Sequence, residues 1–447
     1  MGWQDFLRPL SLALSNVQVD QILERAMAGE ARTRGPRYVR SCISIVLPDG
    51  KTAIAVEETV RISPSPLRVN TMNASSFRLG YRPVLDGVRG LSILLVLIHH
   101  TEFITPISFS ILKGGFLGVD VFFVLSGFLI TSILVEEFET TKTLSFRRFY
   151  MRRALRLLPA VGAVLLFSLI VGSILGFGRL GLTSWRVLSI VGYFTNWVRA
   201  YETPHLWFLT HFWSLAIEEQ FYLFWPFTLI ALLRSGMSRR GVLLTVAALI
   251  LASVALMAAL HSAGATTLRL YTGSDTRAHS LLVGCWFSLA LYWGYLKTES
   301  RTRHQPLGWA TLIVLLAASF LINSGNKILY VGGSFIIAVC AALLIHSLVT
   351  SGRNPLSAIF NHPVLLWLGK RSYGLYVWHW PFFYLCAALR RPALAIPCAL
   401  ISAVVAAALS YRFIELPFLR MKENIKKHKD RAETSADLCA VLSLEKG

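Results

Sequence analysis

Two ionisable residues, Arg89 and His100, lie within one apolar run of the sequence, LDGVRGLSILLVLIHHTEFI. An ionisable side chain inside a membrane span costs about 2 to 4 kcal/mol on insertion scales, so such residues usually mark a transport pathway or a reaction site. A histidine at that depth can accept a proton from an attacking hydroxyl group, which is the task of a general base. The adjacent His99 faces about 100° away on a helix, and the residue types alone allow either histidine to serve.

Two adjacent carboxylates, Glu218 and Glu219, lie in a second segment of this kind, HLWFLTHFWSLAIEEQFYLFWP. Neighbouring side chains on a helix point in different directions, so we expect at most one carboxylate to reach the His100 site. A carboxylate that enters a span can orient the imidazole, stabilise an imidazolium or bind the hydroxyl groups of an acceptor.

A third segment, FRRFYMRRALRLLP, carries Arg153 and Arg156. Residues three apart share one face of a helix. Anchoring at a cytoplasmic membrane boundary explains Arg147 and Arg148 well, but it explains Arg156, one turn deeper in the apolar run, less well. Because arginine forks match phosphate oxygens, this face is a candidate for binding an anionic ligand.

The composition indicates a membrane protein that would hold these groups. Of 447 residues, 54% are hydrophobic and only 15% are charged, whereas a soluble domain carries about a quarter charged residues. The net charge of +20 would suggest nucleic acid in a soluble protein. Here the basic residues cluster between apolar spans, so we expect positive-inside topology and contact with anionic lipid, and no nucleic-acid partner.

Windows of about 20 residues predict an all-α polytopic bundle with ten membrane spans. The predicted spans lie near residues 85–104, 116–135, 155–176, 212–233, 241–261, 279–296, 308–323, 329–349, 372–389 and 394–413. An eleventh apolar stretch, residues 185–198, is short and aromatic. With ten crossings and a cytoplasmic N-terminus, the inward segments hold 19 Lys and Arg and the outward segments 9. This bias favours a re-entrant or interfacial position for residues 185–198, in the inner or plasma membrane, and places both termini in the cytoplasm.

Three regions differ in character. Residues 1–79 form an N-terminal extension, either a small cytoplasmic segment or an upstream addition to a protein that starts at Met72. Within it, residues 1–29 could form an amphipathic helix, and residues 41–60 two short strands around a Pro-Asp-Gly turn. Residues 80–415 form the membrane domain, and residues 416–447 a basic cytoplasmic tail.

Cysteine and histidine spacing predicts no metal site. The six cysteines are scattered without a CxxC pair, which indicates neither a disulfide framework nor a metal site. His205 and His211, six residues apart, share neither a helical face nor a recognised ligand pattern.

In their order, these segments resemble the acyltransferase 3 family of integral membrane acyltransferases, which modify surface polysaccharides, Nod factors and antibiotics. Arg89 and His100 match its motif of an arginine, ten residues and a histidine, and Arg153 and Arg156 match its RxxR element. Further matches are FLGVDVFFVLSGFLI with Asp120 and Ser126, the WSLxxEExFY pattern with Glu218, Glu219 and Tyr222, and GKRSYGLYVWHWPFFYL with Tyr376 and His379. The resemblance covers residues 80–415. The hydrolase-like domain that follows in some members is not expected here, which puts a two-step transfer within one chain in doubt.

The resemblance implies an O-acyltransferase. Acyl-CoA, with acetyl-CoA expected, would be the donor substrate and would dock from the cytoplasm on Arg153 and Arg156. The acceptor would be a hydroxyl group of a carbohydrate or glycosylated molecule, attacking directly or after transfer to a carrier group. No permanently bound cofactor is expected.

The motif spacing selects His100 over His99 and assigns catalytic roles to His100, Arg89, Glu218 and Glu219. Secondary candidates are Asp86, Ser126, Tyr222, Tyr376 and His379. For Ser126 a role in close helix packing is favoured over that of a nucleophile, because no GxSxG elbow surrounds it. Two alternatives remain: a transporter of acyl groups or lipid-linked sugars without chemistry, which an internal repeat would favour, and a membrane-embedded sensor or scaffold.

Overall fold

The computed structural model describes residues 37–46, 52–62, 77–104, 112–201, 207–296 and 305–421. The chain divides into two compact units, Met1–Ala74 and Ser75–Gly447. The helix expected in residues 1–29 and most of the basic tail lie outside the described residues.

The first unit contains an antiparallel pair of strands, β1 (Arg37–Val46) and β2 (Thr52–Ile62). Arg37 pairs with Ile62 and Ser44 with Ala55, and the register shifts between Ser44 and Val46. The two predicted strands are therefore confirmed, whereas the Pro-Asp-Gly turn between them lies outside the described residues.

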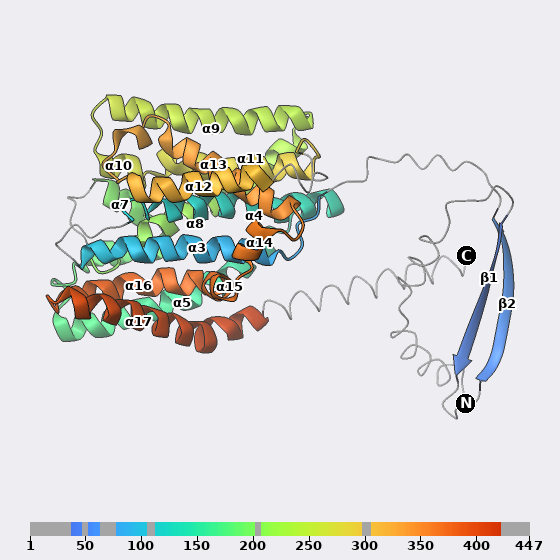
Figure 1. The fold of residues 1–447 in the computed structure, drawn as a ribbon, viewed down its shortest axis with the longest axis horizontal. Coiled ribbons are helices and arrows are strands. Elements are labelled where there is room, and N and C mark those ends of the chain that lie inside the picture. The colour runs from blue at the N-terminus through green and yellow to red at the C-terminus, as the bar shows by residue number, and fades with distance from the viewer. Residues whose placement is uncertain are drawn as a thin grey trace. The chain divides into compact units, whose positions relative to one another are not determined.

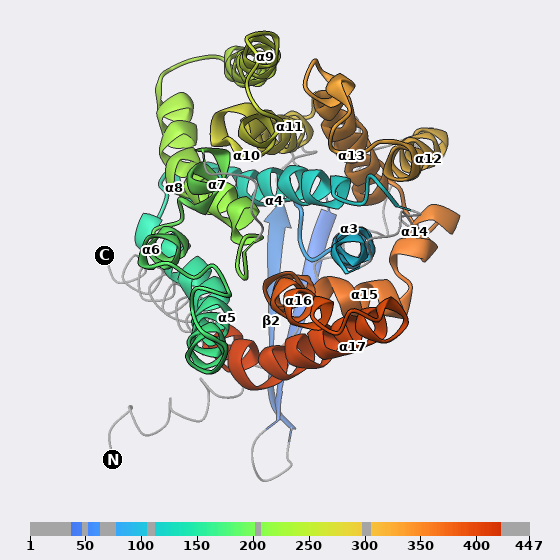
Figure 2. The same ribbon diagram turned by 90° about the vertical axis from the view of Figure 1, so that its left-hand side faces the viewer.

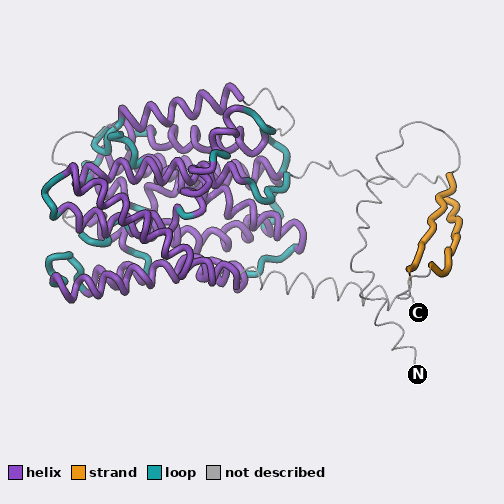
Figure 3. Tube along the Cα trace, turned by 60° about the horizontal axis from the view of Figure 1, so that its bottom comes forward, coloured by secondary structure: helices purple, strands orange, loops and turns teal. Residues whose placement is uncertain are grey.

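Helices and loops make up the described part of the second unit (Figures 1 and 3). The helices are α3 (Pro83–His100), α4 (Leu117–Thr141), α5 (Phe146–Leu175), α6 (Ser184–Val191), α7 (Thr195–Tyr201), α8 (Phe212–Arg234), α9 (Arg239–Ser262), α10 (Thr267–Thr272), α11 (Ser274–Tyr292), α12 (Gln305–Leu321), α13 (Gly333–Thr350), α14 (Pro355–Phe360), α15 (Pro363–Lys370), α16 (Ser372–Ala387) and α17 (Pro392–Ser410). Short 3-10 turns cover Thr101–Phe103 and Lys327–Leu329, and a π-helical turn, Tyr411–Glu415, follows α17.

Six of the described helices are long and apolar enough to cross a membrane, which indicates a multi-pass membrane protein. They are α3, α4, α5, α9, α13 and α17, with α3 extended to Phe103 and α17 to Met421. The predicted count of ten spans is not confirmed. The other four predicted positions hold α8, α11, α12 and α16. Helices α12 and α16 have only 17 and 16 residues, and α8 and α11 carry charged residues that lower their hydropathy.

The aromatic stretch at residues 185–198 does not form one long helix. It is divided between α6, of 8 residues, and α7, of 7 residues. Between them Tyr193 adopts a left-handed backbone conformation with φ of 53°. Each helix is too short to cross a bilayer, which agrees with the expectation that this stretch does not form an eleventh span.

The centre of the bundle is α4. In its 18-residue apolar segment 78% of the residues are buried, whereas in the corresponding segments of α5, α9 and α17 only 28 to 33% are buried. Figure 2, a view along the bundle, shows α3 between α4 and the pair α15 and α16. Glycines let α4 and α11 approach closely: a Cβ atom at Gly127 would lie 1.9 Å from the Leu281 carbonyl oxygen, and one at Gly284 would lie 2.0 Å from that of Val124. This packing fixes the positions of the polar groups on α3, α4 and α16.

Candidate active site

His100, the last residue of α3, meets His379 of α16 in the interior of the bundle. Nδ1 of His100 lies 3.1 Å from Nε2 of His379, and the ring centroids are 4.9 Å apart. His379 is fully buried, and its Nδ1 lies 2.6 Å from the Tyr376 carbonyl oxygen. The Trp380 ring packs edge-on against His100 at 5.0 Å. The histidine selected by its spacing from Arg89 thus has an imidazole partner 279 residues away.

These contacts determine the proton positions when both rings are neutral. A carbonyl oxygen only accepts, so His379 Nδ1 carries the hydrogen and donates it to the Tyr376 oxygen. His379 Nε2 then has a lone pair and accepts from His100 Nδ1–H. The lone pair of His100 is therefore on Nε2. This is the tautomer that a general base requires at that atom.

A third imidazole, that of His211, lies immediately before α8. Its Nε2 lies 3.0 Å from the Val377 carbonyl oxygen and therefore donates to it, while its Nδ1 is buried and has no hydrogen-bond partner among the residues that the structure describes. The ring is 5.3 Å from that of His379. Three histidines from distant parts of the sequence thus lie together.

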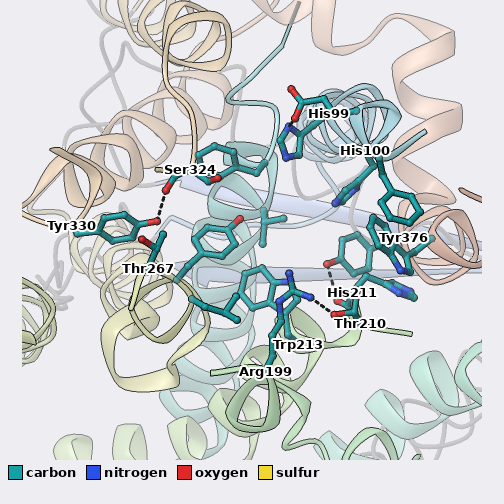
Figure 4. A pocket seen from close by; sticks show the side chains of 17 residues that line it. His99, His100, Arg199, Thr210, His211, Trp213, Thr267, Ser324, Tyr330 and Tyr376 are labelled. Carbon is teal, nitrogen blue, oxygen red and sulfur yellow. Dashed lines mark hydrogen bonds and ion pairs between the residues drawn. The ribbon is translucent and has the colours of Figure 1, made fainter. Parts of the chain in front are cut away.

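A cavity of about 480 Å³, the histidine cavity, opens beside them (Figure 4). Its lining includes His99, His100, Arg199, Thr210, His211, Trp213, Tyr271, Tyr330, Tyr376 and Trp380. Tyr330 donates to the Ser324 carbonyl oxygen at 2.6 Å. Burial raises the pKa of Tyr330 to about 12, so its hydroxyl group remains protonated at neutral pH. Such an aromatic wall with a few polar groups is typical of a small-molecule site.

A second cavity, of about 280 Å³, is named the arginine cavity for Arg89, Arg153 and Arg156, which line it. The same wall includes Ser126, Glu218, Tyr222, Tyr373 and Tyr376. Arg89 lies eleven residues before His100 on α3, which corresponds to about 16 Å along the helix axis. The arginines and the histidine pair therefore lie at different depths in the bundle.

Tyr376 stands where the two cavities meet, because its side chain and that of Val119 line both. The Tyr376 hydroxyl donates to the His211 carbonyl oxygen at 3.1 Å and accepts from Ser214 Oγ at 2.5 Å.

The arginines differ in how their charges are compensated. Arg89 lies 3.3 Å from Asp86, and Arg153 lies 3.8 Å from Glu219 and 3.1 Å above the Tyr222 ring. Arg156 has no ion-pair partner among the described residues. The cavity therefore presents positive charge that suits an anionic ligand.

Neither carboxylate of the adjacent pair contacts the His100 ring in the described part of the chain. Glu218 accepts hydrogen bonds from Ser126 at 2.9 Å and Tyr222 at 3.4 Å, within the arginine cavity. Glu219 faces Arg153. The sequence predicts that at most one of them reaches the His100 site. Among the described residues neither does, because α8 places Ser214 at Tyr376 and Glu218 one turn farther toward the arginines.

Sequence reasoning missed Arg277 and Arg199. Arg277 of α11 forms a buried ion pair with Asp120 of α4, at 2.6 Å, and Ser280 also donates to Asp120, at 3.4 Å. Arg199 of α7 lines the histidine cavity. Each lies between two predicted spans, where the charge count assigns it to an outward loop. The sequence feature that could have identified them is the apolar and aromatic residues around each arginine, in DTRAHSLLVG for Arg277 and TNWVRAY for Arg199.

Within the described ranges, no group of three or more His, Cys, Asp or Glu side chains lies together in a way that could hold a metal ion. His205 lies outside those ranges.

Comparison with known proteins gives a consistent set of relatives. Residues 82–412 match the family model described as an acyltransferase domain. The chain is 34% identical over 367 residues to "Putative O-acetyltransferase SAS0844" of Staphylococcus aureus, covering 78% of this chain and 59% of that protein. It is 36% identical over 367 residues to "Putative peptidoglycan O-acetyltransferase YrhL" of Bacillus subtilis, covering 75% and 55%. It is 33% identical over 365 residues to "Peptidoglycan O-acetyltransferase OatA" of Listeria monocytogenes, covering 75% and 56%.

The matched region thus spans 55 to 59% of the length of these relatives. No solved structure matches the chain.

Proposed function

The chain belongs to this acyltransferase family, and from that premise we propose that it is a membrane O-acetyltransferase that transfers an acetyl group from acetyl-CoA to a hydroxyl group of a cell-envelope carbohydrate. The observation that carries the proposal is the meeting of the arginine cavity and the histidine cavity at Tyr376. One cavity suits an anionic donor, and the other holds a candidate base. The relatives named as peptidoglycan O-acetyltransferases support a carbohydrate acceptor.

The arginine cavity would receive the donor. Its volume of about 280 Å³ is at the lower limit for sites of drug-sized ligands, about 300 to 1,000 Å³, so it suits the pantetheine arm and thioester rather than a whole coenzyme A. Arg153 and Arg156 would bind phosphate oxygens where the arm enters, and the thioester would reach toward Tyr376. Glu218, held by Ser126 and Tyr222, would limit the positive charge along this path.

The histidine cavity would receive the acceptor. Its volume of about 480 Å³ can hold a sugar unit, and its aromatic side chains Trp213, Tyr271 and Trp380 suit the apolar faces of sugar rings. His100 Nε2 carries the lone pair that would remove the proton of the acceptor hydroxyl group.

In the transfer itself, the hydroxyl oxygen attacks the thioester carbonyl carbon while His100 Nε2 takes its proton. The new C–O bond replaces the C–S bond, and the coenzyme leaves as a thiolate that takes the proton back from the imidazolium. Proton transfer of this kind contributes about 10²- to 10⁴-fold to a rate. His379 would hold the His100 ring and stabilise the imidazolium through Nε2. A carrier group, if one intervenes, would use the same base in each step.

The alternative is transport of an acyl group or a lipid-linked sugar without chemistry. Reconstitution of the full chain in liposomes, with acetyl-CoA labelled in its acetyl group and peptidoglycan fragments as the acceptor, distinguishes the two. We expect a labelled ester that mild alkali releases as acetate. Uptake of label without formation of any ester would contradict the proposal and favour transport.

A further inference from the structure

Arg199 presents to the histidine cavity a cation that has no carboxylate partner among the described residues. It lies on α7 and is held by Thr210, whose hydroxyl oxygen accepts from Nη1. Its Nε is buried and has no hydrogen-bond partner in the described part of the chain. No carboxylate of the described residues lies within ion-pair distance of Arg199, so the Nε edge of the guanidinium group has no acceptor among them.

The neighbouring arginines are different. Arg269 makes two hydrogen bonds to Asp275, at 2.9 and 2.6 Å, and Arg277 is paired with Asp120 at 2.6 Å. The carboxylate that lines the histidine cavity, that of Glu102, lies 3.8 Å from His99 Nδ1. The charges of Arg269 and Arg277 are therefore each paired with a carboxylate, whereas the charge of Arg199 has no such partner among the described residues.

An uncompensated cation is costly in a partly buried place unless a ligand supplies the opposite charge. The Nε edge of a guanidinium group can form two parallel hydrogen bonds with a planar carboxylate, a stronger and more specific contact than a single bond. One cation also matches the single charge of a carboxylate. Figure 4 shows Arg199 and His100 approaching the same cavity from different sides.

We propose that Arg199 is a specificity-determining residue that binds a carboxylate of the acceptor, an inference that rests on the proposed function. The acceptor class is then acidic saccharides, with the carboxylate on the acetylated sugar or on its neighbour. Binding at Arg199 would orient the sugar so that one hydroxyl group faces His100 Nε2.

The test uses the purified full chain and three acceptor probes: the methyl glycoside of N-acetylmuramic acid, its methyl ester, and N-acetylglucosamine 6-phosphate. For the carboxylate probe, Arg199→Gln should raise the acceptor KM about tenfold or more, as loss of a charged hydrogen-bonded pair predicts. The acetyl-CoA KM and kcat should remain close to those of wild type. Arg199→Lys should recover part of the loss, and the methyl ester should respond little to either change.

The matched control is Arg179→Gln, which removes an exposed arginine that does not line the cavity and should leave all parameters unchanged. An equal fall in kcat for all three probes would indicate that Arg199 stabilises the oxyanion formed during acyl transfer, and it would overturn the proposal. An effect confined to the phosphate probe, or no effect with any probe, would also overturn it.

Direct binding separates this inference from the proposed function. Wild-type protein in detergent should bind the carboxylate probe, measured by calorimetry, and Arg199→Gln should weaken that binding by the same factor. If binding depends on Arg199 but no probe is ever acetylated, the acetyltransferase proposal fails while the carboxylate site stands. If binding of the carboxylate probe is equal in both proteins, the carboxylate site is refuted whatever the activity.

Discussion

His379 accepts a hydrogen bond from His100 across 3.1 Å, and it can do so because its own Nδ1–H is committed to the Tyr376 carbonyl oxygen. The relationship assigns His379 a positioning role: it fixes the tautomer of His100 and leaves the Nε2 lone pair of that residue available. Because α16 carries both Tyr376 and His379, one helix supplies the residue at the junction of the cavities and the partner of the proposed base.

The first prediction concerns His379. His379→Ala should lower kcat about 10- to 100-fold, because the His100 ring loses the partner that fixes its tautomer. His379→Gln should retain more activity, since its side-chain oxygen can accept from His100 while its nitrogen donates to Tyr376. Steady-state kinetics on purified protein checks this. Equal activity of the Ala and Gln variants would contradict the positioning role.

The second prediction concerns the donor. Arg153→Gln and Arg156→Gln should raise the acetyl-CoA KM about tenfold, with a smaller change in the acceptor KM, because each loses a charge-assisted contact to phosphate. The effect of added salt on donor binding should weaken in both variants. Arg147→Gln, which removes an exposed arginine of the same helix, should behave like wild type. A donor titration unchanged in the first two variants would leave these arginines as membrane anchors.

The third prediction concerns stability. Asp120→Asn leaves the Arg277 charge buried without a counterion, and loss of one partner of a buried pair costs about 3 to 5 kcal/mol. Thermal unfolding in detergent should therefore show a lower Tm, and the double variant Asp120→Asn with Arg277→Met should recover part of it. Lys142→Gln, which removes a 71% exposed member of a surface ion pair, should change stability by less than about 1 kcal/mol. A similar Tm for Asp120→Asn and Lys142→Gln would refute this account.

The fourth prediction concerns topology. The charge bias predicts that residue 201 lies outside and residue 238 in the cytoplasm. In a background without native cysteines, a membrane-impermeant thiol reagent applied to intact cells should label Tyr201→Cys but not Ser238→Cys, both at exposed positions. Labelling of Ser238→Cys alone would reverse the proposed orientation of the chain.

The sequence allowed prediction of features that depend on local spacing. The apolar windows located the helices that carry the site, and the separation of Arg89 from His100 placed them at different depths on α3. Which side chains contact one another across the bundle was not predictable, because it depends on which helices pack together. His379 was a secondary candidate with no assigned partner, and Arg277 was counted as a loop charge although it is buried against Asp120. The partners of Glu218, which are Ser126 and Tyr222, were not predictable either, since sequence gives a residue's face but not the sliding of one helix along another.

The central claim is that His100 Nε2 removes the proton of the acceptor hydroxyl group. It is tested most directly by acetyl transfer in membranes that contain equal amounts of wild-type, His100→Ala and His99→Ala protein, supplied with labelled acetyl-CoA and peptidoglycan fragments. We expect His100→Ala to lower the initial rate of ester formation at least about 100-fold, with normal insertion and unchanged acetyl-CoA binding, and His99→Ala to have a milder effect. Ester formation by His100→Ala at the wild-type rate would contradict the assignment.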